Sequence, residues 1–226
     1  MKRLSSELCY VLGIVLLAVG TALIVRADFG VSMVVAPAYV LHLAISPFWA
    51  MFSFGMSEYC LQGVLLVIMM LIIRRFRMSY MFSIVTAVLY GFLLDGATAL
   101  LSLVAGSSIP FRIGCLLLGG LFAQAGVAFC LHTYIAPEVY ELFVKEVSRR
   151  FSRSVGKVKT IFDVTFLLLA IAMSFLFFGS LQGIGWGTVV ITLVNGYIIG
   201  KFSGFLDKHF TIYDWLPFRS RFEDAE

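Results

Sequence analysis

Six separate apolar runs constrain this chain more than any other feature of its sequence. Each run approaches the ~20 residues that a helix needs to cross ~30 Å of hydrocarbon. The chain of 226 residues is 61% hydrophobic and 13% charged, too few polar side chains to cover a soluble domain of this length. The runs are continuous and do not alternate, which excludes a barrel. We therefore predict an all-α polytopic membrane protein with spans at about Leu8–Val25, Met56–Ile73, Tyr80–Val104, Ile113–Leu131, Thr160–Phe178 and Trp186–Phe205.

Two further segments, Met33–Ile45 and Pro137–Phe151, are too short to span. The first contains Pro37, and we expect it to dip into the membrane or to lie flat on it. The second starts with proline and acidic residues and ends with basic ones, which suits a helix dipole. Its residues Val139, Phe143, Val147 and Phe151 form an apolar stripe. This pattern predicts an amphipathic helix at the cytoplasmic face, and a role as a plain surface anchor stays open.

The positions of the basic residues select a topology. With six crossings and the N-terminus inside, 15 of the 17 Lys and Arg residues fall on the inner side, and only Arg26 and Arg112 fall outside. If Met33–Ile45 also crossed, Arg74, Arg75 and Arg77 would move to the outer side. We therefore predict that both termini are cytoplasmic and that residues 207–226 form a cytoplasmic tail.

One stretch of the sequence recurs weakly. Gly20–His42 aligns without a gap to Gly126–Ser148 at a constant offset of 106, so that Gly20 meets Gly126. The first span runs outward and the fourth runs inward, so we predict two inverted three-helix halves, 1–105 and 106–206, each with one short segment. Two pairs of small residues, Ala18 with Ala22 and Gly119 with Ala123, are expected to allow close helix contact.

Polar and ionisable groups inside apolar spans are the candidate functional residues. Asp95 follows Tyr80 by 15 residues, so it lies roughly 22 Å from the inner end of its span at 1.5 Å per residue, and it needs a partner, a proton or water. Arg26 and Asp28 form a candidate pair at the end of the first span, with a local ion pair as the structural alternative. Gln124 and Asn195 lie deeper in their spans, where hydrogen bonds between helices are the ordinary use.

Other charged groups, among them Glu58, Asp163 and His132, lie near span ends and are expected to be interfacial. We predict that the turns Arg26–Ser32 and Thr133–Glu138 face each other between the two halves and form a solute site. The candidate binding residues are Arg26, Asp28, Ser32, Asp95, Gln124, His132, Tyr134, Glu138 and Asn195.

Familiar catalytic patterns are missing from the sequence. It contains no Walker A, no H-E-x-x-H, no G-x-S-x-G and no clustered His/Cys set. We therefore expect no enzyme activity, no metal, no cofactor and no nucleic-acid partner. The run Gly183-x-Gly185-x-Gly187 predicts a tight outer turn that opens the last span. The four cysteines are expected to pack as small apolar residues.

Four segments, Ile24–Ser32, Thr133–Glu138, Lys157–Ile161 and Gly185–Thr188, together resemble the YczE/YitT-like bacterial integral membrane proteins. The resemblance covers nearly the whole chain. It implies a location in the bacterial inner membrane, but it supplies neither a substrate nor a catalytic residue. Many relatives follow the first turn with a Ser-Pro pair, whereas here Met33 follows Ser32.

These features favour a small permease that binds or transports a small solute in the lipid bilayer, at the interface of two inverted repeats. In this hypothesis Arg26 pairs an anionic group, and Asp95 serves as a proton or cation partner. Two alternatives stay open. One is a non-transporting substrate-binding subunit of an energy-coupled importer that docks through Ala18 and Ala22. The other is an accessory or structural membrane protein. A homodimer or a membrane partner subunit is compatible with each reading.

Overall fold

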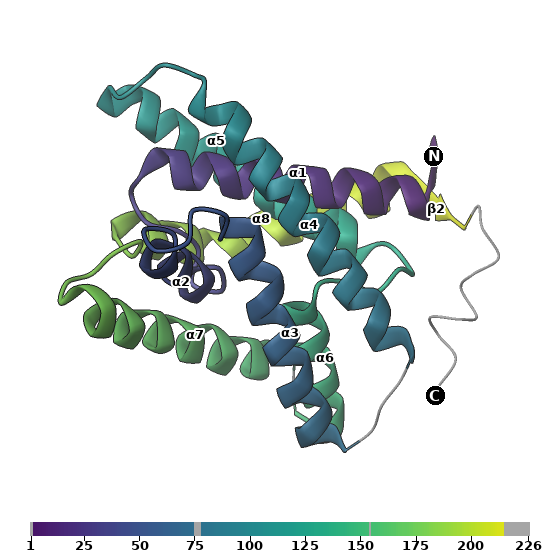
Figure 1. The fold of residues 1–226 in the computed structure, drawn as a ribbon. Helices are drawn as coiled ribbons and strands as arrows, with labels where there is room; N and C mark the ends of the chain where they lie inside the picture. Colours follow the sequence, from purple (N-terminus) through teal and green to yellow (C-terminus); the bar gives the residue numbers. More distant parts are fainter. Residues whose placement is uncertain (1, 75–77, 154, 215–226) are drawn as a thin grey trace.

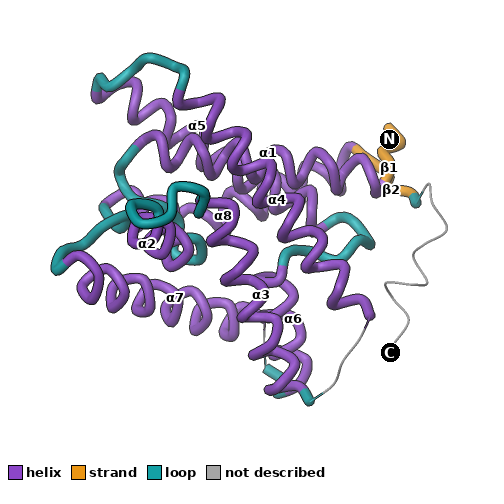
Figure 2. The backbone as a smooth tube through the Cα atoms, viewed as in Figure 1, coloured by secondary structure: helices purple, strands orange, loops and turns teal. Residues whose placement is uncertain are grey.

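The computed structural model describes residues 2–74, 78–153 and 155–214. In these ranges the chain forms eight helices and two short strands (Figure 1, Figure 2). In chain order they are β1 (Lys2–Ser5), α1 (Ser6–Ala27), α2 (Ala36–Ile45), α3 (Phe54–Ile73), α4 (Met78–Ser102), α5 (Ile109–Leu131), α6 (Val139–Arg150), α7 (Val155–Phe178), α8 (Trp186–His209) and β2 (Phe210–Tyr213).

Six of the described helices, α1, α3, α4, α5, α7 and α8, are long and apolar enough to cross a membrane. They coincide with the six predicted spans, with ends shifted by at most five residues. The predicted class, an all-α polytopic membrane protein with six spans, is therefore confirmed. Many large apolar side chains on these helices are exposed, Leu193 at 77% among them, as expected of surfaces that face lipid.

α1 and α5 cross at the centre with their backbones in contact (Figure 1). Glycines at the crossing make this approach feasible. A Cβ atom on Gly20 would lie 2.7 Å from the carbonyl oxygen of Gly119, and one on Gly126 would lie 2.6 Å from that of Gly13. No side chain fits at these distances, so the predicted close contact through Gly119 is confirmed.

The remaining helices pack around this pair. α4 lies against α1, and α8 lies against α5. α2 contacts α3 and α7, whereas α6 contacts α7, α3 and α4. The largest core cluster fills the junction of α3, α6 and α7, where Met69, Tyr140 and Phe162 are buried together.

Both short helices are packed inside the protein. In α2 the side chains of Ala36, Ala38 and Val40 are fully buried, so one face of this helix packs against the rest of the protein. α6 buries Tyr140, which lies beside the predicted stripe, and Val144, which the stripe omits, while Phe151 at its end is 57% exposed. A spacing of four residues drifts by about 40° per step around a helix of 3.6 residues per turn, so Phe151 points away from Val139. α6 is therefore a core element and not a plain surface anchor.

The two short strands meet at one end of the molecule. β1 pairs with β2 in parallel, from Lys2 opposite Phe210 to Ser5 opposite Tyr213, and Figure 1 shows the N-terminus beside β2. The predicted tail, residues 207–226, thus begins with the last three residues of α8 and continues into β2, and its residues 215–226 lie outside the described residues. Arg75, Arg77, Arg219 and Arg221 of the topology argument lie outside them as well.

A pair of turns closes the opposite end. The Gly187 amide donates to the Phe29 carbonyl at 2.9 Å, and the Val31 amide donates to the Gly183 carbonyl at 2.9 Å. Gly183 has a φ of +71°, and Gly185 is the N-cap of α8. The predicted tight turn before the last span is therefore confirmed.

Candidate functional site

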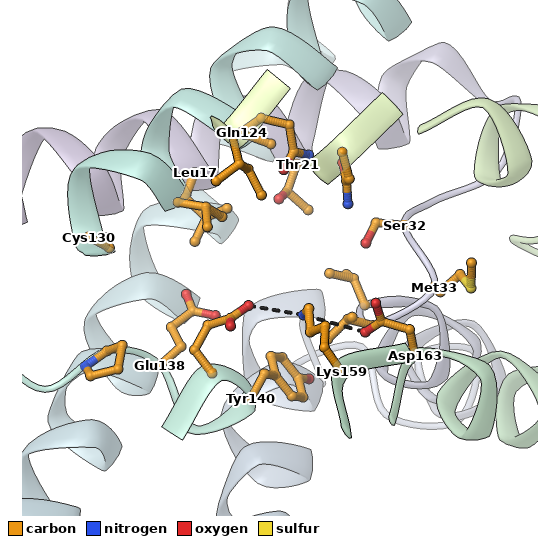
Figure 3. A pocket seen from close by; sticks show the side chains of 18 of the residues that line it. Leu17, Thr21, Ser32, Met33, Gln124, Cys130, Glu138, Tyr140, Lys159 and Asp163 are labelled. Carbon is orange, nitrogen blue, oxygen red and sulfur yellow. Dashed lines mark hydrogen bonds and ion pairs between the residues drawn. The ribbon is translucent and has the colours of Figure 1, made fainter. Parts of the chain in front are cut away.

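A cavity of about 250 Å³ lies at the centre of the protein (Figure 3). Six helices (α1, α4, α5, α6, α7 and α8) border it, together with the segment Ser32–Val35 and the turn that precedes α6. In Figure 3, Thr21 and Gln124 lie above the opening, and Glu138, Tyr140, Lys159 and Asp163 lie below it. The two walls differ in chemistry, because the one below carries ionisable groups and the one above carries neutral ones.

The lower wall is organised by Lys159. Its Nζ donates to Glu141 Oε1 at 3.0 Å and lies 3.4 Å from Asp163 Oδ1. Lys159 and Asp163 are four residues apart on α7, which places them on one helical face. Glu141 comes from the first turn of α6. The packing of α6 against α7 thus assembles an ion-pair network at the cavity.

Glu138 lines the same wall, directly before α6. Its Oε1 is buried and has no hydrogen-bond partner among the described residues. Burial, and then the nearby carboxyl groups of Glu58 and Glu141, raise the pKa of Glu138 well above its usual value, whereas Lys159 acts to lower it. The surroundings of Glu138 therefore favour its neutral, protonated form more than water does.

The upper wall offers neutral hydrogen-bonding groups. Gln124 on α5 is only 5% exposed, and its side chain forms no hydrogen bond within the described part of the chain. Asn195 on α8 has a buried Oδ1 that is likewise unpartnered among those residues. The Tyr90 hydroxyl donates to Thr21 Oγ1 at 3.1 Å, so this pair is satisfied internally.

A second buried carboxyl group lies behind Tyr140. Glu58 on α3 is 0% exposed, and the Tyr140 hydroxyl donates to its Oε2 at 2.8 Å. Gln62, one turn further along α3, accepts from the Val139 amide at 3.2 Å. The prediction that Glu58 is interfacial is therefore wrong, because α6 covers it.

Four of the predicted site residues, Ser32, Gln124, Glu138 and Asn195, line the cavity. The predicted pair of Arg26 with Asp28 does not form. Arg26 donates to the carbonyl oxygens of Val104 and Gly106, at 2.9 and 3.1 Å. Asp28 forms an ion pair with Arg112 at 2.9 Å instead. Both groups hold the ends of α1, α4 and α5 together.

The other three predicted residues also lie away from the cavity. Asp95 accepts from Ser53 Oγ at 2.5 Å and from the Gly55 amide at 2.7 Å, so its carboxylate fixes the start of α3. His132 pairs with Asp207 at 3.1 Å, and the Tyr134 hydroxyl donates to Glu7 at 2.9 Å. His132 and Tyr134 border a separate hollow of about 460 Å³ beside β2.

The two predicted turns do not face each other. The first, Arg26–Ser32, follows the end of α1, whereas Thr133 and Tyr134 hydrogen-bond to Ser6 at its start. α1 has 22 residues, so these positions are roughly 33 Å apart along its axis. Only the inner ends of the two turns, at Ser32 and Glu138, reach the cavity.

Sequence reasoning missed the charged network of Lys159, Glu141 and Asp163. Asp163 was predicted to be interfacial, yet it lines the central cavity. A signal was present, because a lysine and an aspartate four residues apart stand at the start of an apolar run. Among the described residues, no group of three or more His, Cys, Asp or Glu side chains is arranged to hold a metal ion.

Comparison with known proteins gives one family. Residues 4–204 match the model described as "Family of unknown function (DUF6198)". The chain therefore belongs to this family, and the match covers nearly its full length. Comparison with curated proteins and with solved structures yields no match.

Proposed function

We propose that this chain is a small membrane permease that binds a solute in the central cavity and carries it across the bilayer. One observation carries the proposal: polar and ionisable groups from six helices converge on a cavity inside a largely apolar protein. Such groups are costly at this depth, and in membrane proteins they mark solute and ion pathways. No chemical step is part of this function.

The order and packing of the helices support two inverted repeats. A long helix, a short helix and two long helices follow one another twice, as α1 to α4 and as α5 to α8. When each helix is replaced by its counterpart in the other set, the following helix–helix contacts are converted into one another. The contact of α1 with α4 becomes that of α5 with α8, and the contact of α2 with α7 becomes that of α6 with α3. A two-fold axis in the membrane plane produces this reciprocity.

The glycines of the α1–α5 crossing support the same axis. At the offset of 106, Gly13 corresponds to Gly119 and Gly20 corresponds to Gly126. The contacts are crosswise: Gly13 meets Gly126, and Gly20 meets Gly119. Two equivalent surfaces related by a two-fold axis touch in this reciprocal way. In the proposal the axis passes through the crossing, and the two halves rock about it to open the cavity to either side.

We further propose that the protein lies in a bacterial inner membrane with both termini in the cytoplasm. The basic residues support this orientation, because Lys145, Arg149 and Arg150 belong to α6, and Lys208 ends α8 beside β2. The outer end then holds Arg26 and Arg112. A reporter that fluoresces only in the cytoplasm, fused after Glu226, should be bright, and a dark fusion would reverse the orientation.

The function is tested by binding and uptake with the purified chain. A metabolite library screened by thermal unfolding should contain at least one ligand that raises the melting temperature with dose. Asn195→Leu should abolish that rise, whereas Arg26→Ala, outside the cavity, should retain it. The ligand should then accumulate in proteoliposomes. Binding without uptake would point instead to the substrate-binding subunit of an importer, and no ligand at all would contradict the permease.

A further inference from the structure

Apart from the Gln124 amide, which can both donate and accept, the buried unpartnered atoms at the cavity are oxygen atoms. Glu138 Oε1, Asp163 Oδ1 and Asn195 Oδ1 are buried and accept no hydrogen bond from any described residue, although Asp163 keeps its 3.4 Å ion pair with Lys159. Buried acceptors without a donor are costly, and native proteins seldom keep several of them in one place. A molecule that satisfies this cavity must therefore donate hydrogen bonds.

The charged groups at the cavity favour the same kind of ligand. Three carboxyl groups, of Glu138, Glu141 and Asp163, line it together with one ammonium group, that of Lys159. Lys159 is already engaged by Glu141 and Asp163. Glu138 is thus left without a cation among the described residues, although its carboxyl group borders the open space.

We propose that the cavity binds a small organic cation carrying an ammonium or guanidinium group, and that Glu138 releases its proton as the cation arrives. This inference rests on the proposed function, since it names the solute class of the same site. The O–H bond of the Glu138 carboxyl group breaks, the proton passes to water, and the carboxylate forms an ion pair with the cation. No electron is transferred, and the charge of the cavity stays constant.

The surroundings of Glu138 explain why it holds a proton until then. Burial and neighbouring carboxyl groups raise its pKa, and Lys159 opposes this only in part. Three charged or ionisable groups act on Glu138: Glu58 on α3, Glu141 on α6 and Lys159 on α7. Four more titratable groups are near enough to respond to its charge, and they are Tyr10 on α1, Tyr90 on α4, Cys130 on α5 and Tyr140 on α6. Only one of these groups is a cation at neutral pH.

The size and the upper wall of the cavity limit the cation. A volume of about 250 Å³ corresponds to roughly eight waters at ~30 Å³ each, which suits a cation with a short carbon chain. Gln124 presents a buried amide without a partner among the described residues, which can bind the far end of the solute. Leu17, Ile24 and Val127 supply apolar lining for the chain between these ends.

The test uses the purified full chain with three probes of similar size and different charge: n-butylammonium, n-butanol and butyrate. Calorimetry should give an affinity for n-butylammonium at least tenfold above that for either other probe. In weak buffer at a pH below the pKa of Glu138, binding should release close to one proton per cation. At pH values below the pKa of Glu138, the affinity should rise about tenfold for each unit by which the pH is raised. The reason is that less free energy is needed to remove the proton at the higher pH.

Substitutions test whether Glu138 is the residue that releases the proton. Glu138→Gln should lower the affinity for n-butylammonium at least tenfold and abolish proton release. Glu146→Gln is the matched control: it lies on the same helix, accepts from Tyr80 at 3.1 Å and is absent from the cavity lining, so it should retain both. If Glu138→Gln fails to fold, Glu138→Asp should bind with proton release and with a lower affinity.

Three outcomes would overturn the inference in distinguishable ways. Tighter binding of butyrate or butanol, still sensitive to Asn195→Leu, would keep the solute site but refute the cation. Binding of n-butylammonium without proton release would refute the role of Glu138. Absence of binding by all three probes would contradict the inferred solute class, and the library screen would then decide on the permease separately.

Discussion

The two long hairpins of the protein, α3–α4 and α7–α8, each join two successive long apolar helices, but within the described ranges only the first brings its two helices into close contact. In the first, Gly55 and Gly91 bring the backbones together: a Cβ atom on Gly91 would lie 2.8 Å from the Gly55 carbonyl oxygen. In the second, Gly196, Gly200 and Gly204 have no atom within 4 Å of such a Cβ position. Among the described residues, α7 and α8 make no comparable contact.

The difference locates the cavity. Where α3 and α4 are in close contact, the Asp95 side chain has a structural role, because its hydrogen bonds fix the start of α3. Where α7 and α8 stay apart, Lys159, Asp163 and Asn195 border open space. A polar residue in a span is thus structural in the closed hairpin and available to a solute in the open one. In a permease of two inverted repeats, this asymmetry corresponds to one of its two end states.

The largest effect is expected from adding a methyl group at the glycine contact between α3 and α4. Gly91→Ala places a methyl group against the Gly55 carbonyl and should destabilise the protein by about 3 kcal/mol or more, since backbone atoms cannot yield as side chains do. Gly204→Ala on the open hairpin meets nothing and should change stability by less than ~1 kcal/mol. The folded fraction after heating, measured by size-exclusion chromatography, compares the two. Equal losses would contradict the packing difference.

Substitutions of Asp95 and Asn195 should also differ in their effect on stability, with the larger loss in the closed hairpin. Asp95→Ala removes the acceptor of the Gly55 amide and should cost about 1–3 kcal/mol. Asn195→Leu removes a buried oxygen that has no partner among the described residues, so stability should stay constant or rise. Thermal unfolding in detergent measures both changes. A marked loss in Asn195→Leu would mean that the open hairpin uses this side chain structurally.

A smaller effect is expected at the junction of α3 with α6. Tyr140→Phe removes the donor to the fully buried Glu58 and should cost about 1–2 kcal/mol. Tyr80→Phe on α4, which loses the bond to Glu146 of α6 at 3.1 Å, is the comparison. Unfolding curves for both variants at one pH give the difference. Tyr140→Phe as stable as the natural chain would show that Glu58 finds another donor.

The smallest effect is the pH dependence that Glu138 imposes. Its pKa in the folded protein lies above the usual 4.5, so the folded state binds the proton more tightly than the unfolded state. Its contribution to stability is complete below pH 4.5 and is lost as the pH rises toward the folded pKa. Melting temperatures measured from pH 5 upward should therefore fall less steeply in Glu138→Gln. An unchanged slope in that variant would exclude Glu138 as the titrating group.

Much of the fold could be predicted from the order of the residues. Apolar runs long enough to cross a bilayer fix the six spans, because a backbone in hydrocarbon must satisfy its own hydrogen bonds within a helix. The turn at Gly183 and the small residues of the α1–α5 crossing were also predictable, since positive φ and backbone contact leave little choice of residue. These features depend on local chemistry alone.

The partners of the polar groups were decided only by tertiary structure. Arg26, Asp28 and Asp95 looked like a site in the sequence, but each meets a carbonyl, an amide or a counter-ion that lies far along the chain. Lys159 and Glu141 meet because α6 packs against α7. Burial and pairing depend on which helices touch, and a linear pattern of polar residues does not contain that information. The sequence therefore determined a six-span membrane protein, and helix packing decided which of its charged groups border a cavity.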